Sequence, residues 1–436
     1  MEGRALLEIL SDYNYWGSFN KPLFERKEYQ TLLGSNLKAN VISIVKGVRR
    51  AGKSSIILKY ISTSVNAERS LVLNLEDPRL PQNIDAGFLM DALDAYSASV
   101  DPDGPVLVVI DEAQNAKGWE KFARYLVETR EIKCIVTGSS AALLSEEYAT
   151  SITGRHIDME IFPLSFGEFV SFKGVKASNE LEITKNRHKI MHALEEYMTY
   201  GGFPEVILND DKRIKGELLR GYFNDILIKD IAKRYHIKLH SQLEAITKDY
   251  LSNIGTRLSL RNISASYKIG LRTVERFSQY LSNAYLLFYI DKFSFSKRVQ
   301  GRSAKKVYTI DNGFYSMLGF KFMEQRDKLM ENLVAIRLLA DASRKHSIEI
   351  YYWQDYQQHE VDFVVKEGNL VKRLVQVTYA SSRADIGARE TGNLIRASDQ
   401  LHCRALLCIT WNYEGEIKES GKKIQCIPLW RWLTEA

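Results

Sequence analysis

The stretch that most constrains the fold is residues 41–59, which read VISIVKGVRRAGKSSIILK. An apolar run comes first, a glycine-bounded turn follows, and apolar residues then recur at helical spacing. The turn fits the spacing G-x-x-x-x-G-K-[ST], in which backbone N–H groups bind phosphates, the lysine reaches the outer phosphates and the hydroxyl binds Mg²⁺. A helix N-terminus also favours a bound anion. The residues predicted to bind the nucleotide phosphates are Gly47, Val48, Arg49, Arg50, Ala51, Gly52, Lys53, Ser54 and Ser55, with Arg49 and Arg50 open to either phosphate or solvent.

Strand and helix patterns alternate after this turn. That alternation favours a mostly parallel sheet covered by helices on both faces, with ligands bound beyond the carboxyl ends of the strands. Before the sheet, residues 24–37 are expected to form one or two helices. The four predicted strands are 41–46, 71–75, 106–110 and 133–137.

Polar side chains follow two of these strands. Asp111 and Glu112 come directly after the strand 106–110, where Asp111 is expected to hold Mg²⁺ and Glu112 to orient or deprotonate the attacking water. The alternative is that the two acids only begin a loop. Thr137 follows the next strand together with Ser139 and Ser140, and it is predicted either to sense the γ-phosphate or to make an ordinary turn.

Arg155 leaves a turn just after the predicted sheet. One interpretation is an arginine finger that reaches the nucleotide of a neighbouring subunit. The other is a surface salt bridge. Shortly afterwards, Ser165 and Glu168 have the spacing of a capping box that opens a helix.

Six separated segments, in order GVRRAGKSS, NLEDPRL, VLVVIDEAQN, TGSSAALL, TGRHIDMEIFPLSFGEF and YGGFPE, resemble the archaeal and bacterial AAA-type ATPases that carry a nuclease-like C-terminal domain. The resemblance implies an α/β fold with a P-loop core, ATP and Mg²⁺ as cofactors, and Asp111 with Glu112 as the Walker B pair. It also implies a catalytic role for Lys53 and places Arg155 in a Gly-Arg motif. The expected domains are an ATPase core at 1–175, a helical lid at 176–240, a winged helix at 241–320 and a nuclease-like α/β domain at 321–436.

Within the expected lid, Gly201-Gly202 precedes Phe203-Pro204 and breaks the helical pattern, with a packing turn as the simplest explanation. The following segment has helix-turn-helix spacing. Its second helix offers Arg272 and Arg276 to phosphates or base edges. Two strands joined by a basic stretch then resemble a wing, for which DNA is the expected partner and a flexible hairpin or a protein contact the alternatives. The basic residues predicted to contact DNA there are Lys297, Arg298, Arg302, Lys305 and Lys306.

The C-terminal pattern is a long helix, 325–345, followed by three strands. This order resembles the PD-(D/E)xK nuclease fold. On that comparison Glu331 is the helix acid and Asp362 the metal ligand, while Gln376 and Thr378 stand where a glutamate and a lysine are expected. Since metal-assisted hydrolysis needs carboxylates and usually a cation, we expect a retained fold with a degenerate nuclease site.

Composition limits the remaining possibilities. The net charge of +6 favours an anionic partner. Four cysteines without C-x-x-C spacing predict neither a disulfide framework nor a zinc site. No signal peptide or membrane span is recognised, so we expect a cytoplasmic protein. The leading hypothesis is an ATP-hydrolysing switch or motor that engages DNA, with a possible homo-oligomer. The alternatives are a nucleotide-stabilised protein-interaction module with slow turnover and, third, an ATP-dependent nuclease.

Overall fold

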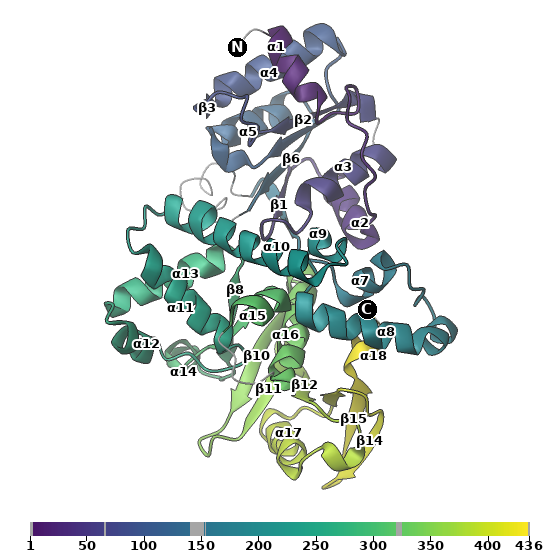
Figure 1. Cartoon of the computed structure of the whole chain (residues 1–436), viewed down its shortest axis with the longest axis vertical. Helices are drawn as coiled ribbons and strands as arrows, with labels where there is room; N and C mark the ends of the chain where they lie inside the picture. The colour runs from purple at the N-terminus through teal and green to yellow at the C-terminus, as the bar shows by residue number, and fades with distance from the viewer. Residues whose placement is uncertain (1–2, 65–66, 140–151, 153, 320–324, 435–436) are drawn as a thin grey trace. The chain divides into compact units, whose positions relative to one another are not determined.

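The computed structural model describes residues 3–64, 67–139, 152, 154–319 and 325–434 (Figure 1). The chain divides into two compact units, Met1–Ile161 and Phe162–Ala436. Each unit has its own sheet and its own buried core. In the described ranges, no helix is both long and apolar enough to cross a membrane.

The first unit is built on a five-stranded parallel sheet with the order β2-β4-β6-β1-β7. The strands lie within about a residue of the ranges predicted from the apolar runs. Strand β6 lies between β1, which precedes the glycine-rich loop, and β4, which carries the two acids. The carboxyl ends of all three strands therefore meet at one edge. The strands are β1 (Ile42–Lys46), β2 (Ser70–Asn74), β4 (Leu107–Asp111), β6 (Lys133–Gly138) and β7 (His156–Glu160).

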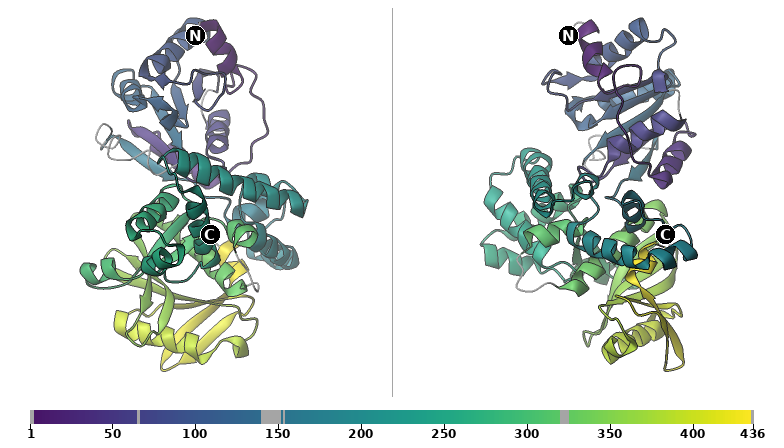
Figure 2. Two further views of the ribbon diagram at one scale, coloured as in Figure 1. Left: turned by 60° about the vertical axis from the view of Figure 1, so that its left-hand side comes forward. Right: turned by 45° about the vertical axis from the view of Figure 1, so that its right-hand side comes forward.

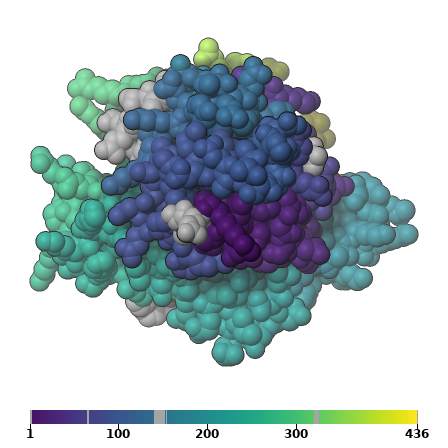
Figure 3. All heavy atoms as spheres, turned by 90° about the horizontal axis from the view of Figure 1, so that it is seen from above, coloured from purple at the N-terminus to yellow at the C-terminus, as the bar shows by residue number. Residues whose placement is uncertain are grey.

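Helices cover both faces of this sheet. Side chains of α1, α4 and α5 share one core with alternate residues of the strands, while α2 packs on α3 at the other side (Figure 1). Helix α1, dark purple in Figure 3, lies on the outside of the unit. The helices are α1 (Gly3–Ser11), α2 (Lys27–Asn36), α3 (Lys53–Ser64), α4 (Ala86–Ser99) and α5 (Trp119–Thr129), and a short pair of strands is formed by β3 (Ile84–Asp85) and β5 (Ala116–Lys117).

The second unit begins with a helical layer. Helix α7 opens with the predicted capping box, in which Ser165 accepts from the N–H of Glu168 and Glu168 accepts from the N–H of Ser165. The unit starts at Phe162, whereas the predicted boundary is at residue 175, and α7 packs on α8 of the same unit. The helices of this layer are α7 (Phe166–Phe172), α8 (Glu180–Tyr200), α9 (Pro204–Ile207), α10 (Lys212–Asp225), η4 (Ile226–Lys233), α11 (His240–Ser252), α12 (Leu260–Tyr267), α13 (Leu271–Asn283) and α15 (Asn312–Leu318).

The carboxylate of Asp311, the residue before α15, packs against the backbone of Gly201 and Gly202. Asp311 accepts hydrogen bonds from the N–H groups of Gly202 at 2.6 Å and Gly313 at 2.8 Å. A Cβ atom at Gly201, which has φ +75°, would lie 1.6 Å from Asp311 Oδ1. The glycine pair thus makes room for a buried carboxylate, which agrees with the packing-turn interpretation.

The expected winged-helix strands are not a separate sheet. Strands β8 and β9 continue an eight-stranded sheet with the order β14-β15-β13-β12-β11-β10-β8-β9. Figure 2 shows the C-terminal part of the second unit, yellow-green to yellow, from two further sides. Strand β8 pairs in parallel with β10 at Asp291 and Tyr351. The expected boundary at residue 320 therefore falls within one continuous sheet. The strands are β8 (Leu287–Lys292), β9 (Lys306–Thr309), β10 (Ile348–Gln354), β11 (Glu360–Glu367), β12 (Leu370–Thr378), β13 (Leu406–Thr410), β14 (Gly415–Glu419) and β15 (Lys422–Pro428).

The two faces of this sheet are covered by different helices. Phe363 and Val375 share a core with α16 (Arg326–Arg344), whereas their neighbours Val364 and Leu374 share another core with α17 (Ala388–Leu401). Alternation of side chains along β11 and β12 produces this division. The chain ends on α18 (Leu429–Thr434), which packs on α7 and β15.

The connection between β8 and β9, which the sequence analysis compared with a wing, is partly helical. It contains a short helix, α14 (Lys297–Arg302), whose N-cap Ser296 accepts from the N–H of Val299. A capped turn with good helix formers stabilises this conformation.

Candidate functional site

The loop between β1 and α3 has the backbone of a phosphate-binding turn. Gly47 has φ +147°, and a Cβ atom there would lie 2.2 Å from the carbonyl oxygen of Ile161. Arg50 and Gly52 also have positive φ, at 69° and 95°. These conformations fold the chain over the N-terminus of α3, where unpaired N–H groups favour an anion.

Lys53 is the first residue of α3, and its side chain is 4% exposed. Its ammonium donates to the carbonyl oxygens of Gly47 at 3.1 Å and Val48 at 3.4 Å. It also lies 3.8 Å from Glu112 Oε1. The ammonium is therefore held over its own loop, between the turn and the second acid of β4.

Ser54, Asp111 and Thr137 converge from three elements. Ser54 Oγ donates to Asp111 Oδ2 at 2.8 Å, and Thr137 Oγ1 donates to Asp111 Oδ1 at 2.5 Å. Burial raises the pKa of Asp111, and the neighbouring charge of Glu112 raises it further. A hydroxyl beside a buried carboxylate fits Mg²⁺, which usually takes one or two carboxylates together with phosphate oxygens and water.

Glu112 occupies a left-handed conformation, with φ 56° and ψ 52°. Its N–H donates to Thr137 Oγ1 at 3.0 Å, and its Oε2 accepts from Gln114 Nε2 at 2.6 Å. Burial alone would raise the pKa of Glu112, but the charge of Lys53 and the Gln114 hydrogen bond lower it overall. The arrangement keeps Glu112 ionised, as a group that accepts a proton or orients water requires.

A cavity of about 440 Å³ opens beside these residues. Ser54, Asp111 and Glu112 line one side, and Tyr13 and Lys21 from the segment after α1 line another. Its size is within the range of small-molecule sites. The sequence analysis did not predict this contribution of the N-terminal segment, because no motif in it indicates a ligand.

Three arginines were also predicted to act at the nucleotide site, and the structure places each of them. Arg155 Nε lies 2.8 Å from Glu128 Oε1 of α5, with side chains 51% and 40% exposed. Arg49 pairs with Glu76 at 3.0 Å, and Arg50 lines the cavity. Within its own unit Arg155 therefore forms a surface salt bridge, which was the second interpretation. Its role as an arginine finger for the nucleotide of a neighbouring subunit stays a prediction. Ser140 and Thr153 lie outside the described residues.

The predicted DNA-contacting residues divide into two groups. Arg272 and Arg276 are exposed on α13, opposite the buried Val274, Phe277 and Leu281. On the connection between β8 and β9, the side chains of Lys297, Arg298 and Arg302 are also exposed. Lys305 pairs with Asp291 at 3.0 Å. Lys306 is 2% exposed, so its predicted contact with DNA is incompatible with this structure.

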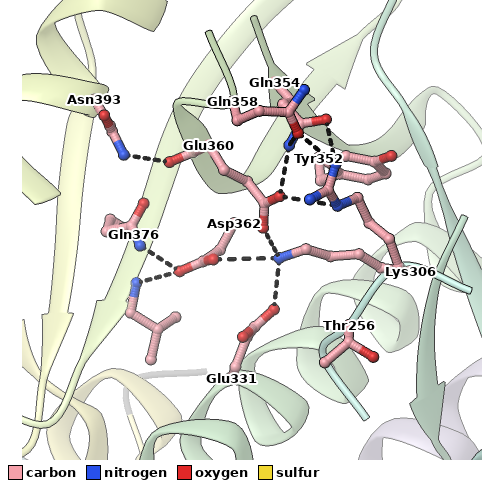
Figure 4. Close-up of polar contacts among 12 residues, drawn as sticks. Thr256, Lys306, Glu331, Tyr352, Gln354, Gln358, Glu360, Asp362, Gln376 and Asn393 are labelled. Atoms are coloured by element: carbon pink, nitrogen blue, oxygen red, sulfur yellow. Dashed lines mark hydrogen bonds and ion pairs between the residues drawn. The ribbon is translucent and has the colours of Figure 1, made fainter. Parts of the chain in front are cut away.

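The predicted degenerate nuclease residues meet in the second unit (Figure 4). Glu331 and Asp362 both approach the ammonium of Lys306, at 3.0 Å and 3.4 Å. Gln376 Nε2 donates to Asp362 Oδ2 at 2.7 Å. Thr378 lies two residues farther along β12 and hence on the same face as Gln376. Sequence reasoning missed Glu360, whose spacing two residues before Asp362 could have indicated it.

Comparisons with known protein families support an ATPase domain that lies mostly in the first unit. Residues 39–170 match the AAA domain family, which supports an AAA-type ATPase, nucleotide binding and ATPase activity in general. Residues 191–324 and 326–432 match two further families that are described as domains of unknown function.

Relatives extend over nearly the whole chain. An uncharacterized protein of Methanocaldococcus jannaschii is 29% identical over 407 residues, which cover 90% of this chain and 88% of that protein. An uncharacterized protein of Haemophilus influenzae is 27% identical over 426 residues, which cover 95% of this chain and 100% of that protein. Among solved structures, the Walker-type ATPase of Pyrococcus abyssi is 14% identical with a TM-score of 0.48, covering 70% of this chain and 99% of that one.

Proposed function

We propose that this chain is an ATP-hydrolysing switch or motor of the AAA type that engages DNA through its second unit. The observation that carries the enzymatic part is the convergence of Ser54, Asp111, Thr137 and Glu112 beside the buried Lys53. These residues come from two neighbouring strand ends, those of β4 and β6, and one helix N-terminus, that of α3. That is the edge at which open α/β sheets bind ligands.

Each side chain has a role in this proposal. Lys53 and the loop N–H groups bind phosphate oxygens, while Ser54 and Asp111 hold Mg²⁺, which when bound neutralises charge on the phosphates. Glu112 orients or deprotonates the attacking water. Thr137 fixes both acids through one hydroxyl, since it donates to Asp111 and accepts from the Glu112 N–H.

The DNA part of the proposal rests on exposed positive charge in the second unit. Lys297, Arg298 and Arg302 are exposed on and around a six-residue helix, and Arg272 and Arg276 are exposed on α13. Such cations bind phosphates independently of sequence and release counterions. Arginines on a helix of a helix-turn-helix can also read base edges.

A second candidate function is a nucleotide-stabilised protein-interaction module with slow turnover. The pairing of Arg155 with Glu128 in its own unit favours it, because a finger engaged in this way does not act on a neighbouring nucleotide. An ATP-dependent nuclease is the third candidate. Gln376 and Thr378 disfavour it, and we expect no Mg²⁺- or Mn²⁺-dependent cleavage of plasmid DNA; cleavage that disappears in Asp362→Ala would promote it.

Steady-state ATP hydrolysis with and without duplex DNA distinguishes the first two functions. The proposal expects Mg²⁺-dependent turnover that duplex DNA stimulates, and loss of that stimulation in the Lys297→Ala, Arg298→Ala, Arg302→Ala variant. A matched control replaces Lys372, Lys418 and Lys423, which are exposed on strands β12, β14 and β15. Turnover that DNA leaves unchanged would favour the protein-interaction module.

A further inference from the structure

Lys306 is a buried cation surrounded by carboxylates. It is the first residue of β9, directly after the basic connection, and it is 2% exposed. Its ammonium lies 2.7 Å from Glu360 Oε1, 3.0 Å from Glu331 Oε1 and 3.4 Å from Asp362 Oδ1 (Figure 4). One ammonium thus contacts three acids from two other elements, α16 and β11.

Further partners hold the carboxylates in place around this ammonium. Tyr308 donates to Glu331 Oε1 at 2.7 Å. Asp362 Oδ2 accepts from Gln376 Nε2 at 2.7 Å and from the N–H of Val377 at 2.9 Å. Arg257 Nε lies 3.7 Å from the other oxygen of Glu360. The free lone pairs of the three acids are therefore directed toward one central point, as around a bound ion.

We propose that the Lys306 ammonium is the built-in cation of a three-carboxylate centre that would otherwise hold a divalent metal ion. Glu331, Glu360 and Asp362 supply the hard oxygen ligands that Mg²⁺ and Mn²⁺ prefer, and Lys306 occupies the position of the ion. The inference concerns the second unit and does not depend on the proposed ATPase function.

Electrostatics agree with this geometry. Burial by itself lowers the pKa of Lys306, but the charges of Glu331, Tyr308, Asp362 and Glu360 raise it well above its ordinary value, so the ammonium stays charged. Among the described residues, no group of three or more His, Cys, Asp or Glu side chains is arranged to hold a metal ion. The three carboxylates surround the ammonium instead.

Through these ion pairs Lys306 attaches strand β9 to helix α16 and strand β11. Removing the ammonium leaves the buried Asp362 close to the partly buried Glu331 and Glu360, a strongly unfavourable arrangement without a cation. A divalent ion is then the simplest replacement. The wild-type chain, in contrast, has no room for one at this point.

The test is a Mn²⁺ titration of the full-length protein without nucleotide, followed by thermal unfolding and by calorimetry. We expect Lys306→Met to bind Mn²⁺ about tenfold or more tightly than the wild type, with a Tm that rises with Mn²⁺ concentration. The gain should disappear when Asp362→Asn is added, which separates this centre from any Mn²⁺ bound at Asp111. The control, Lys305→Met, removes the neighbouring exposed lysine and should behave as the wild type.

If Lys306→Met does not fold in Mn²⁺-free buffer, the titration is made with Lys306→Met combined with Glu360→Gln, which reduces the excess negative charge. Recovery of folding by Mn²⁺ in either variant supports the proposal. Absence of an Asp362-dependent Mn²⁺ effect in both variants overturns it. Wild-type binding of Mn²⁺ that Asp362→Asn abolishes overturns it as well, because the centre would then accept metal with Lys306 in place.

Discussion

Ser54 Oγ donates to Asp111 Oδ2 over 2.8 Å, although 57 positions separate the two residues in the chain. The contact joins the N-terminus of α3 to the end of β4 across the intervening strand β6. It exists because all these strands are parallel and end at the same edge. The pair proposed to hold Mg²⁺ is therefore preorganised by the sheet.

Thr137 should affect chemistry more than nucleotide binding. In Thr137→Val the hydroxyl that contacts Asp111 and Glu112 is lost while the side-chain volume is kept. Because a hydrogen bond to a charged group contributes about 1.5–3 kcal/mol, we expect hydrolysis to slow by about tenfold to a hundredfold. Single-turnover rates and ATP affinity measured separately check this. Thr137→Ser keeps the hydroxyl and should retain most of the rate; equal losses in both variants would contradict the role.

Arg155→Ala tests the proposed action on a neighbouring subunit. An arginine finger contributes on the order of a thousandfold in rate, so we expect much slower turnover with nearly unchanged ATP affinity. Addition of Glu112→Gln subunits should partly restore activity in mixed assemblies. Stability should fall by no more than about 1 kcal/mol, because the ion pair with Glu128 is exposed. Arg124→Ala is the control, since Arg124 also pairs with Glu128. Wild-type turnover in Arg155→Ala would refute the role.

The basic connection should provide electrostatic affinity for duplex DNA. Replacing Lys297, Arg298 and Arg302 by alanine should weaken binding to unrelated sequences and lower the log–log salt slope by about one per lost contact. Arg276→Ala should instead cost about 1–3 kcal/mol at a preferred site and little elsewhere. Binding isotherms at several salt concentrations measure both effects. An unchanged affinity and slope in the triple variant would leave protein interaction as the better explanation.

Asp311 should make the stability of the second unit pH-dependent. Burial raises the pKa of Asp311 to about 7, whereas a carboxyl in the unfolded chain titrates near about 4. Between these values the folded state keeps a proton that the unfolded state has lost, so stability falls as pH rises from about 4 to 7. We expect a loss on the order of 2–4 kcal/mol across this window. Asp311→Asn should reduce the slope but not abolish it, because the pKa of Asp362 is also raised to about 7 by burial. Asp210→Asn should leave the slope unchanged, as urea unfolding between pH 4 and 8 would show.

The sequence predicted most strands and helices correctly because their apolar runs are buried in a regular alternation. The strand predicted at 106–110, for example, agrees with β4 to within one residue. The phosphate-binding loop was equally clear, since its spacing depends on local backbone geometry. Such features are encoded by neighbouring residues.

The position of Lys306 could not be predicted in this way. In the sequence it ends a basic stretch, and nothing nearby shows that β9 brings it to acids of α16 and β11 that come 25 and 56 positions later. The sequence analysis also missed the capped helix α14, because the connection was interpreted only as the basic loop of a wing. The pairing of β8 with β10, which places β9 at the edge of the large sheet, is a long-range feature of this kind.

The most direct test of the ATPase assignment compares Lys53→Ala with Glu112→Gln in ATP binding and in ATP turnover. Lys53 lies over the phosphate loop, so Lys53→Ala should lose ATP binding. Glu112 acts as water attacks, so Glu112→Gln should bind ATP normally and hydrolyse it about 10²- to 10⁴-fold more slowly. Lys59→Ala, on the same helix, should match the wild type in both measurements. Equal loss of ATP binding in Lys53→Ala and Glu112→Gln, or wild-type turnover in Glu112→Gln, would contradict the assignment.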